Sequence, residues 1–522
     1  MVSKQDNQPA DVCIVGAGAA GGVLAKKLAE AGFKVVVLEA GPHWDPQNDW
    51  TSDELDMKKL GWRELRLVDG KDPLRLGHNN SGFGVGGGTC HFTGVALRFH
   101  ESDFEVKTRD GVAEDWPIKY KDLEPYYHQI EQEIAVSGPR DFPWGAFRGP
   151  YPQPERNPVS ANAEVFMIGC ERLGIRSSVT PVAILSAPYN DRPPCTNRGF
   201  CNQGCKPNAK FSTLITYIPQ AQRAGAKVLP NCMVTKVNLD NNGKVSGVTY
   251  VHDGQEYEQR TRVVILSAFV IETPRLLLNS ACPQFPNGLA NTSGMVGKNL
   301  MPHSSHDVYA YFDREIRLYK GTPVLASTQD FYETEPGRGF VRGYTIHAHG
   351  SRPVAFGRAI ANQYLLWGKA LQDLLRDYNF YARLTLVGEV LPNPNNQVAL
   401  DPNLKDRHGL PVPKVTFGYG DNDLKLIAHG VEKCKEILAA AGGEPRYVVA
   451  DTAHLHGTCR MGNDPKTSVV NGFCQSHDIP NLFICDASVF VTSGGANPTM
   501  TVMALAARTA DYIPKAMGRR EI

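Results

Sequence analysis

Short apolar runs and one helical repeat dominate the first forty residues. Residues 11–15 and 34–38 each read as a strand buried on both faces, because their apolar positions follow one another without polar alternation. Between these runs, Val23, Leu24 and Leu28 recur at helical spacing until Gly32 ends the repeat. The pattern predicts a strand–turn–helix–strand unit.

Longer-range changes in the pattern divide the rest of the chain. Residues 303–420 contain alternating segments that predict an antiparallel sheet with one polar face, whereas the flanking regions return to helices and buried strands. The expected strands are 262–266, 306–312, 381–389 and 481–486, and the expected helices are 115–134, one opened by Pro274, 423–441 and a last one through Tyr512. We therefore predict an α/β fold with an α+β insertion.

This fold assigns the chain to two domains. A Rossmann-like nucleotide-binding domain is assembled from discontinuous segments, and an antiparallel-sheet substrate or cap domain is inserted between them. The expected segments are 9–45, 80–100, 195–302 and 450–522 for the first domain, and 101–194 and 303–449, with connecting segments, for the second.

The turn after the first strand carries the sequence GAGAAG, with Gly16, Gly18 and Gly21. The first glycine permits a tight turn, the second lets a pyrophosphate approach the backbone, and the third allows close packing of helix on strand. Glu39 ends the second strand, 18 residues after Gly21, where a carboxylate binds ribose hydroxyls and disfavours a 2′-phosphate. The unit therefore predicts a dinucleotide site.

Composition argues against several classes of protein. The 522 residues include 55 Lys and Arg against 54 Asp and Glu, a net charge of +1, which argues against binding to nucleic acid through bulk charge. No apolar run is long enough to predict a membrane span. The N-terminus has no apolar signal core, and twelve cysteines at this length do not form a secreted disulfide framework.

A second glycine-dense loop lies at residues 82–88, where five of seven residues are glycine. Such a loop suits a backbone pressed against a flat ligand. A flexible linker is the alternative, but here the loop runs straight into Thr89-Cys-His-Phe-Thr93.

These segments resemble the glucose–methanol–choline (GMC) family of flavin oxidoreductases over nearly the whole chain. The resemblance rests on GAGAAG with Glu39, GVGGGTCHF at 84–92, MVGKNLMPH at 295–303, HLHGTCRMG at 454–462 and NLFICDASVFVTSGGANPTMTVMAL at 481–505. SAPYNDRPPC before the cysteine group and EVLPNPNNQVAL at 389–400 are most similar to bacterial membrane-associated sugar dehydrogenase catalytic subunits of the fructose, glucose and gluconate type.

The resemblance implies FAD between the two domains and a catalytic pair at His454 and Asn497. The histidine would act as a base on a substrate hydroxyl while hydride passes to the flavin, and the amide would hold the same oxygen. His456 is the local rival, since on a strand it would share a face with His454. The FAD-binding residues implied are Gly16, Gly18, Gly21, Glu39, Gly88, His91, Val234, Asp486, Asn497 and Thr499.

His91 falls where related pyranose oxidases bond the flavin covalently, within a Thr-His-Trp-Thr segment that reads Cys90-His91-Phe92-Thr93 here. The two readings, a covalent FAD at His91 and a histidine packed near the ring, stay open. A separate departure from the family is Phe269, which stands where glycine is usual. The bulky side chain should push the local backbone away from the cofactor.

Cys195, Cys201 and Cys205 lie close together in a Gly-, Asn- and Pro-rich loop. Three thiolates at this spacing could ligate a [3Fe–4S] cluster that carries electrons from the flavin to an outside acceptor. The related dehydrogenases have a second adjacent cysteine where this chain has Thr196. Reduced structural thiols and one disulfide are the alternatives, and zinc lacks a fourth ligand at finger spacing.

The sequence thus favours an FAD-dependent dehydrogenase that oxidises a hydroxyl of a sugar or glycoside and passes electrons to a small partner subunit, a haem subunit or another acceptor. An oxygen-using alcohol or pyranose oxidase of the same family is the first alternative, and a non-catalytic flavoprotein scaffold for electron transfer is the second. Location is expected to be cytoplasmic, or periplasmic if a partner subunit carries the export signal.

Overall fold

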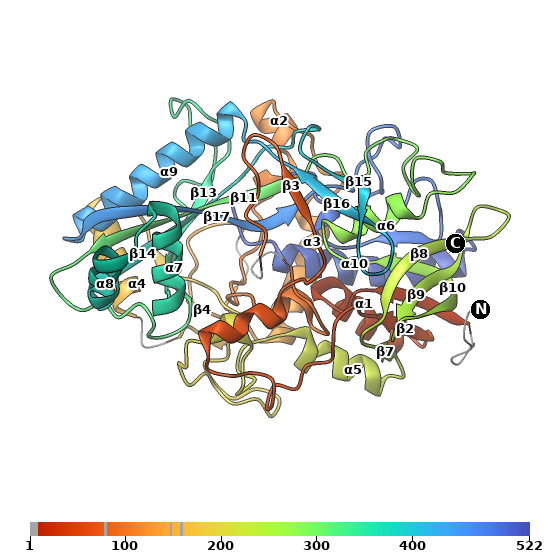
Figure 1. The fold of residues 1–522 in the computed structure, drawn as a ribbon, viewed down its shortest axis with the longest axis horizontal. Helices are drawn as coiled ribbons and strands as arrows, with labels where there is room; N and C mark the ends of the chain where they lie inside the picture. The colour runs from red at the N-terminus through yellow and green to blue at the C-terminus, as the bar shows by residue number, and fades with distance from the viewer. Residues whose placement is uncertain (1–8, 78–80, 147–148, 157–159) are drawn as a thin grey trace.

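The computed structural model of the chain describes residues 9–77, 81–146, 149–156 and 160–522. The first eight residues, which bear on the expectation about an export signal, lie outside the described residues. The chain forms two sheet-based halves side by side, and both termini lie in the same half (Figure 1).

The half that holds the termini is built on a mixed sheet. Its parallel part runs β7–β2–β1–β10–β18, and the first half of β10 also pairs antiparallel with β9, which pairs with β8. β1 and β2 are buried along almost their whole length, as the uninterrupted apolar runs predicted. The strands are β1 (Ala10–Val15), β2 (Val35–Leu38), β7 (Lys227–Leu229), β8 (Met233–Leu239), β9 (Val245–His252), β10 (Gln255–Leu266) and β18 (Leu482–Ile484).

Helices cover the parallel part of this sheet. Helix α1 follows β1 directly and contacts α5 and α10, and α10 also contacts α3. The helices are α1 (Ala19–Glu30), α3 (Tyr120–Ile134), α5 (Tyr217–Arg223), α6 (Glu272–Asn279) and α10 (Thr499–Gly518). The predicted strand–turn–helix–strand unit is thus present, with β1 and β2 parallel and adjacent.

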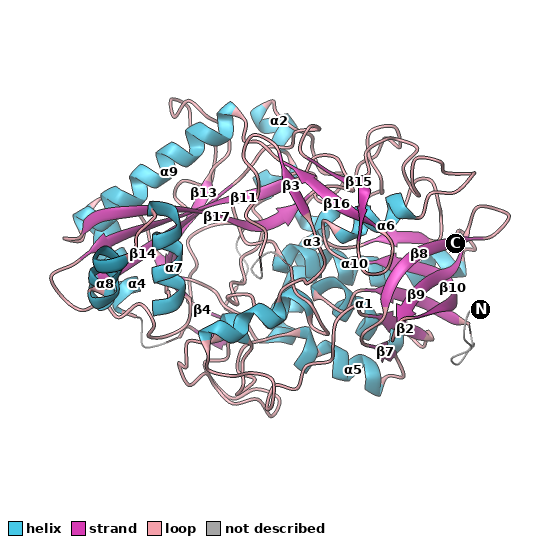
Figure 2. Ribbon diagram, in the orientation of Figure 1, coloured by secondary structure: helices cyan, strands magenta, loops and turns pink. Residues whose placement is uncertain are grey.

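The second half is an antiparallel sheet in the order β17–β11–β14–β13–β12–β6. Helix α9 contacts four of its strands and α4 packs beside α9, so one face is covered (Figure 2). The elements are β6 (Ser178–Val179), β11 (Met301–Tyr311), β12 (Val324–Thr328), β13 (Tyr344–His349), β14 (Tyr381–Gly388), β17 (Glu444–His456), α4 (Ala161–Arg172) and α9 (Asp421–Ala440). The opposite face lines a cavity, described below.

Smaller elements complete the fold. They are the sheet of β3 (Leu67–Asp69), β15 (Gln397–Lys405) and β16 (Pro411–Thr416), the pair β4 (Ser137–Gly138) and β5 (Gln153–Pro154), and helices α2 (Val106–Asp110), α7 (Pro353–Tyr364) and α8 (Gly368–Arg376). Helices α7 and α8 interrupt the region expected to be only sheet, and α3 begins five residues later than predicted. The α/β class with an antiparallel insertion is confirmed.

A buried cluster of charges joins the segment of Asp103 and Asp110 to Arg342 and Glu389 of the antiparallel-sheet half. The Arg342 guanidinium donates from Nε to Glu389 (2.9 Å), from Nη1 to Asp110 (3.2 Å) and from Nη2 to Asp103. Asp103 also accepts from the Tyr332 hydroxyl (2.7 Å). Arg342, Asp103 and Glu389 are each 1 % exposed or less, so one guanidinium balances three carboxylates away from water.

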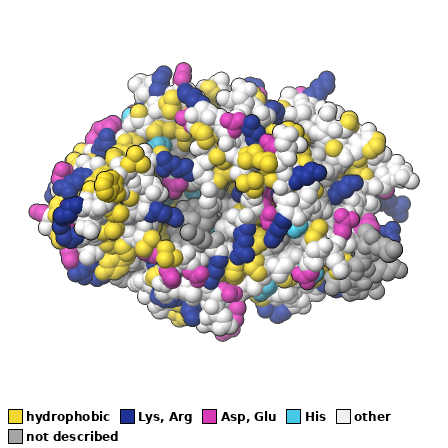
Figure 3. All heavy atoms as spheres, viewed as in Figure 1, with side chains coloured by type: hydrophobic (Ala, Val, Ile, Leu, Met, Phe, Trp, Pro, Cys, Tyr) yellow, Lys and Arg dark blue, Asp and Glu magenta, His cyan; other side chains and the backbone are white. Residues whose placement is uncertain are grey.

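The surface is mixed in charge. Figure 3 shows Lys and Arg side chains interspersed with Asp and Glu over the face in view, in keeping with the near-zero net charge. Among the described helices, none combines the length and apolar character needed to cross a membrane.

Candidate active site

Two cavities meet between the halves. The smaller, about 230 Å³, lies over the glycine turn and is lined by Gly16, Gly18, Glu39, Val234 and Asp486. The larger, about 640 Å³, lies against the open face of the antiparallel sheet. Gly88, Phe269 and Thr499 line both cavities, so the spaces are continuous around these residues. Sequence motifs far apart in the chain therefore line one connected space.

The glycines of the two loops permit close backbone approach. A Cβ on Gly16 would overlap the Ser267 carbonyl, and one on Gly87 would lie 2.8 Å from the Gly18 Cα. Gly88, in contrast, has no atom within 4 Å of a Cβ position and faces the open space. Gly21 does not line either cavity; a Cβ there would overlap the Gly16 carbonyl, so this glycine allows α1 to pack on the turn.

Glu39 stands at the end of β2, buried beside the glycine turn. Its Oε2 accepts from the Ala17 N–H (2.9 Å), and its Oε1 accepts from the N–H groups of Gly41 (2.9 Å) and Gly84 (3.2 Å). Burial raises the pKa of Glu39, while these backbone donors oppose the rise. A carboxylate has further acceptor positions, so Glu39 can fix the turn and also accept from ribose hydroxyls.

The far wall of the smaller cavity comes from three other segments. Val234 lies on β8, Asp486 follows β18, and Thr499 begins α10. Burial raises the pKa of Asp486, whose Oδ2 accepts from the Phe269 N–H (3.0 Å) and the Thr273 hydroxyl (2.7 Å). The N-terminus of the long helix α10 favours negative charge in the space in front of it.

Phe269 stands where the resemblance leads one to expect glycine. Its φ of +83° lies in the left-handed region that glycine favours, so the backbone keeps a glycine-like conformation despite the side chain. The side chain itself lines both cavities. The side chain therefore narrows the space where the two cavities meet, and the expected displacement of the backbone stays a prediction.

His454 reaches the larger cavity because of a β-bulge. On β17, Ala453 pairs with His303 of β11 and Leu455 pairs with Pro302, so His454 is an extra residue between two paired positions. Its φ is +40°, a strained value for a non-glycine residue. Bulges of this kind re-aim side chains beside active sites. The bulge places His454 in the lining of the cavity, together with Asn497.

Hydrogen bonds fix which nitrogen of His454 carries the proton. His303 Nε2 lies 3.0 Å from the Ser493 carbonyl and 2.7 Å from the Gly494 carbonyl, so this nitrogen must donate. His303 Nδ1 is then the acceptor, and at 3.0 Å it receives the proton of His454 Nδ1. Nε2 of neutral His454 is left with a lone pair, which faces the Asn497 amide nitrogen at 3.3 Å. His454 is thereby held as a base.

The same surroundings keep the imidazoles neutral. Burial lowers the pKa of His454 well below its ordinary value, and the neighbouring His303 and His347 lower it further. Burial likewise lowers the pKa of His303 and of His347 to about 4. His347 Nε2 donates to the Asn497 carbonyl oxygen (3.1 Å), which orients the amide with its nitrogen toward His454.

His456, the rival of His454, lies outside both cavity linings. Its ring is fully buried and stacks on Phe490, and its Nδ1 donates to the Met301 carbonyl (3.2 Å). The two histidines do not share a face, because the bulge at His454 interrupts the strand alternation on which that expectation rested.

Sequence reasoning missed His303 and His347. His303 ends the MVGKNLMPH segment, which carried the family resemblance without drawing attention to the histidine. His347 lies on β13 and has no motif around it. Only the pairing of β11 with β17, and the approach of the loop before α10, reveal that both rings contact the His454–Asn497 pair.

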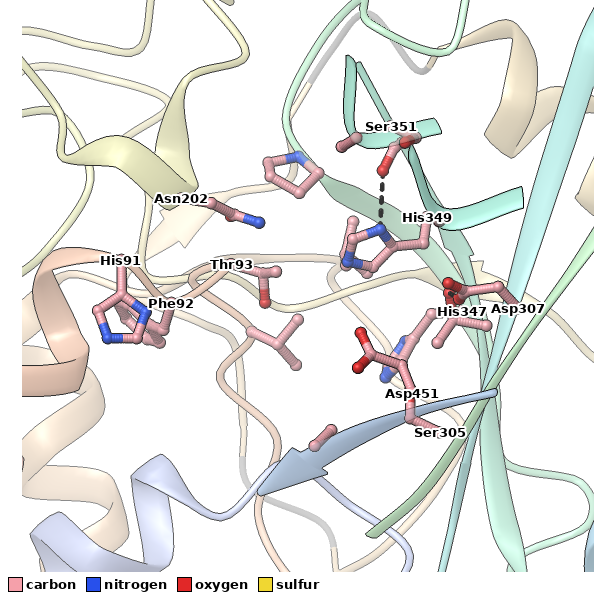
Figure 4. A pocket seen from close by; sticks show the side chains of 18 of the residues that line it. His91, Phe92, Thr93, Asn202, Ser305, Asp307, His347, His349, Ser351 and Asp451 are labelled. Atoms are coloured by element: carbon pink, nitrogen blue, oxygen red, sulfur yellow. Dashed lines mark hydrogen bonds between the residues drawn. The ribbon is translucent and has the colours of Figure 1, made fainter. Parts of the chain in front are cut away.

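His91 lies in the larger cavity, across from the antiparallel sheet. Figure 4 shows His91, Phe92 and Thr93 on one side and His347, His349, Asp307 and Asp451 on the other. His91 follows the glycine loop, and its backbone N–H donates to the Gly88 carbonyl (3.2 Å). This placement is compatible with attachment to a flavin and also with simple packing beside one.

The cysteine loop brings the thiols of Cys195, Cys201 and Cys205 near one another. Burial raises the pKa of the Cys201 thiol to about 12, and Cys205 and Cys195 add to the rise. Buried Lys210 is close enough to oppose it. Within the described ranges, no group of three His, Cys, Asp or Glu side chains is placed to hold a metal ion. The iron–sulfur cluster gains no support and stays a prediction.

Similarity to known proteins extends over nearly the whole chain. Residues 14–305 and 392–506 match the N- and C-terminal family models described as GMC oxidoreductase. The chain is 33% identical to 2-methyl-1,2-propanediol dehydrogenase of Mycolicibacterium austroafricanum, covering 97% of this chain and 95% of that protein. It is 30% identical to the fructose dehydrogenase large subunit of Gluconobacter japonicus, covering 97% of each.

Solved structures share the fold at lower identity. Pyridoxine 4-oxidase from Mesorbium loti superposes with a TM-score of 0.71 at 17% identity, over 97% of this chain and 99% of that one. A formate oxidase variant from Aspergillus oryzae, studied for its FAD modification, superposes with a TM-score of 0.74 at 17% identity. The match covers 99% of this chain and 100% of that one.

Proposed function

This chain belongs to the GMC oxidoreductase family, and from that membership we propose that it is a dehydrogenase that oxidises a hydroxyl of a sugar, glycoside or related polyol. The family makes it an FAD-dependent oxidoreductase of CH–OH groups. The observation that supports the proposal is the His454–Asn497 pair, with an unprotonated His454 Nε2, at one end of the space that begins at the glycine turn.

The chain's residues fit FAD in that space. The glycine turn leaves no side chain between the backbone and a pyrophosphate, Glu39 faces the ribose position, and the N-terminus of α10 stands at the junction of the cavities. Bound FAD supplies the acceptor for the hydride that leaves the substrate carbon.

His454 and Asn497 would act on the substrate oxygen. His454 Nε2 accepts the hydroxyl proton, and its Nδ1–H remains fixed on His303. The long 3.3 Å contact between Asn497 and His454 leaves the amide free to turn its N–H onto the same oxygen. The carbonyl product forms when the C–H bond gives up its hydride and the O–H bond gives up its proton.

The dehydrogenase assignment is supported by the two relatives at 33% and 30% identity, both of which are dehydrogenases. One of them is a large subunit, and we propose that this chain also works with a smaller partner subunit that receives the electrons. Oxidases occur among the relatives too, for example paromamine 6′-oxidase of Streptomyces fradiae at 27% identity. An oxygen-using oxidase is therefore the second candidate function.

We expect the FAD-loaded protein to be bleached anaerobically by at least one sugar or polyol, and to turn over with a quinone or ferricyanide at least about tenfold faster than with oxygen. Flavin absorbance and oxygen uptake measure the two parts. Equal turnover in oxygen would make the protein an oxidase, and no bleaching by any alcohol would leave a non-catalytic flavoprotein. Acid precipitation decides whether FAD is attached covalently, because covalent FAD stays with the precipitate.

Iron analysis decides the cluster separately. If Cys195, Cys201 and Cys205 bind a [3Fe–4S] cluster, anaerobically purified protein should contain three irons per flavin. Replacing the three cysteines by serine should then remove the iron and the paramagnetic signal of the oxidised protein, while FAD stays bound. Flavin without iron in the unmodified protein would end this prediction.

A further inference from the structure

Asp451 lies in the same cavity as His454 and on the same strand. It pairs with Ser305 of β11, and the regular alternation of β17 directs it to the open face of the sheet. The bulge at His454 turns that residue toward the same space. Both side chains line the larger cavity, and Figure 4 shows Asp451 directed into it.

The Asp451 carboxylate has acceptor capacity that the protein does not use. Its Oδ1 accepts from the Thr452 N–H (2.8 Å), and no Lys or Arg of the described chain forms an ion pair with it. Burial and the nearby Asp307 raise the pKa of Asp451, while Arg383 and Arg75 oppose the rise. Arg383 itself donates to Asp307 (2.7 Å) and to the Gly350 carbonyl.

Unlike Asp451, Asp307 is paired with an arginine, and it also accepts from the Thr385 hydroxyl (2.7 Å). Glu54, the third carboxylate of the lining, accepts from the N–H groups of Val354 and Ala355 (3.1 Å each). Asp451 thus keeps acceptor capacity open toward the cavity.

A second acceptor faces the same space from β13. His349 Nδ1 donates to the Gly350 carbonyl (2.8 Å), so its Nε2 carries the lone pair. Burial lowers the pKa of His349 well below its ordinary value and keeps the ring neutral. This wall of the cavity therefore accepts hydrogen bonds, and it needs a ligand with several O–H or N–H donors.

The charged residues of the cavity lining limit which of these ligands can bind there. The described residues that line the cavity include four arginines and three carboxylates, so the balance does not favour a cation. A ligand anion would be repelled by Asp451 at this wall. Neutral hydroxyl groups are the donors that suit both conditions.

We propose that Asp451 determines substrate specificity by accepting a hydrogen bond from a second hydroxyl, next to the one that His454 deprotonates, so that the enzyme takes neutral vicinal polyols in preference to simple alcohols. The inference rests on the proposed function, because it assigns the substrate class of that site. Asp451 positions the substrate and takes no part in the proton or hydride transfer.

The test compares matched substrates that differ by one hydroxyl. The pairs are 1,2-propanediol with 1-propanol and D-glucose with 2-deoxy-D-glucose, assayed with an artificial electron acceptor. Asp451→Leu should raise KM for the hydroxylated member about 10- to 100-fold, the scale of a hydrogen bond to a charged group, with kcat changed by less than about threefold. KM for the member that lacks the hydroxyl should stay unchanged. Asp451→Asn keeps one carbonyl oxygen, so its KM for the hydroxylated member should lie between those of the wild type and of Asp451→Leu.

Glu444→Gln is the matched control, since Glu444 is an exposed carboxylate at the far end of the same strand, paired with Arg446. FAD content and thermal midpoint report whether Asp451→Leu folds. Wild type that prefers the member lacking the hydroxyl, or an Asp451→Leu variant that retains the wild-type preference, would overturn the inference while the proposed function stands. Wild type that carries FAD but oxidises no alcohol would overturn both.

Discussion

Replacing His454 by alanine should lower turnover by about 10²-fold or more while FAD stays bound. The structure gives the reason, since His303 holds the proton on Nδ1 and leaves Nε2 of His454 as the free base. Burial lowers the pKa of His454 well below its ordinary value, so the base is available throughout the neutral range. Anaerobic flavin reduction under single-turnover conditions measures the step directly.

Two variants serve as comparisons for this result. Asn497→Ala should lower turnover less, because it removes one hydrogen-bond donor and leaves the base. His456→Ala should alter stability more than chemistry, because His456 packs on Phe490 outside the cavity lining. If His454→Ala kept near-normal turnover and His456→Ala abolished it, the assignment of the base would be wrong.

Replacing Arg342 by methionine should lower the free energy of unfolding by about 3–5 kcal/mol at neutral pH. Methionine fills much of the volume but leaves Asp103, Asp110 and Glu389 without a cation in a region closed to water. The loop before α10 should loosen as well, since Tyr332 links Asp103 to the Gly495 N–H (3.1 Å). Chemical denaturation of the FAD-loaded protein measures the loss.

Arg376→Met is the control for that measurement. Arg376 also contacts two carboxylates, Asp373 and Asp377, but its side chain is 64% exposed, so its loss should change stability far less than the loss of Arg342. Burial raises the pKa of Asp103 and of Glu389. Their protonation at lower pH neutralises the unpaired charge, so the deficit of Arg342→Met should shrink as the pH falls. If the loss of unfolding free energy in Arg342→Met did not depend on pH, it would come from lost side-chain packing rather than from the unpaired carboxylates.

The sequence predicted the parts of the site that depend on local pattern. The unit around Gly16, Gly18 and Glu39 follows from neighbouring residues, and the structure forms it with parallel β1 and β2. The motifs around His454 and Asn497 were also visible in the sequence, although their meeting was implied only by the family resemblance.

The remaining features depend on contacts between distant segments. His303 contacts His454 across 151 positions of the sequence, and His347 contacts Asn497 across 150. The bulge at His454 follows from the register of β11 on β17, which no local pattern encodes. Asp451 belongs to none of the motifs found in the sequence, and its open acceptor position becomes visible only with the cavity wall in place.

The pairing of β1 with β10 bears on when the protein can acquire its cofactor during synthesis. Ala10 pairs with Thr261, and β10 in turn pairs with β18 near residue 484. The central sheet therefore cannot close while the ribosome still holds the later segments, and slow, non-local pairing of this kind leaves strand edges exposed until then. The glycine turn at residues 16–21 is synthesised long before its opposing wall at residues 486–499, so the nascent chain must stay competent to fold while the segments between them are made, before FAD can bind.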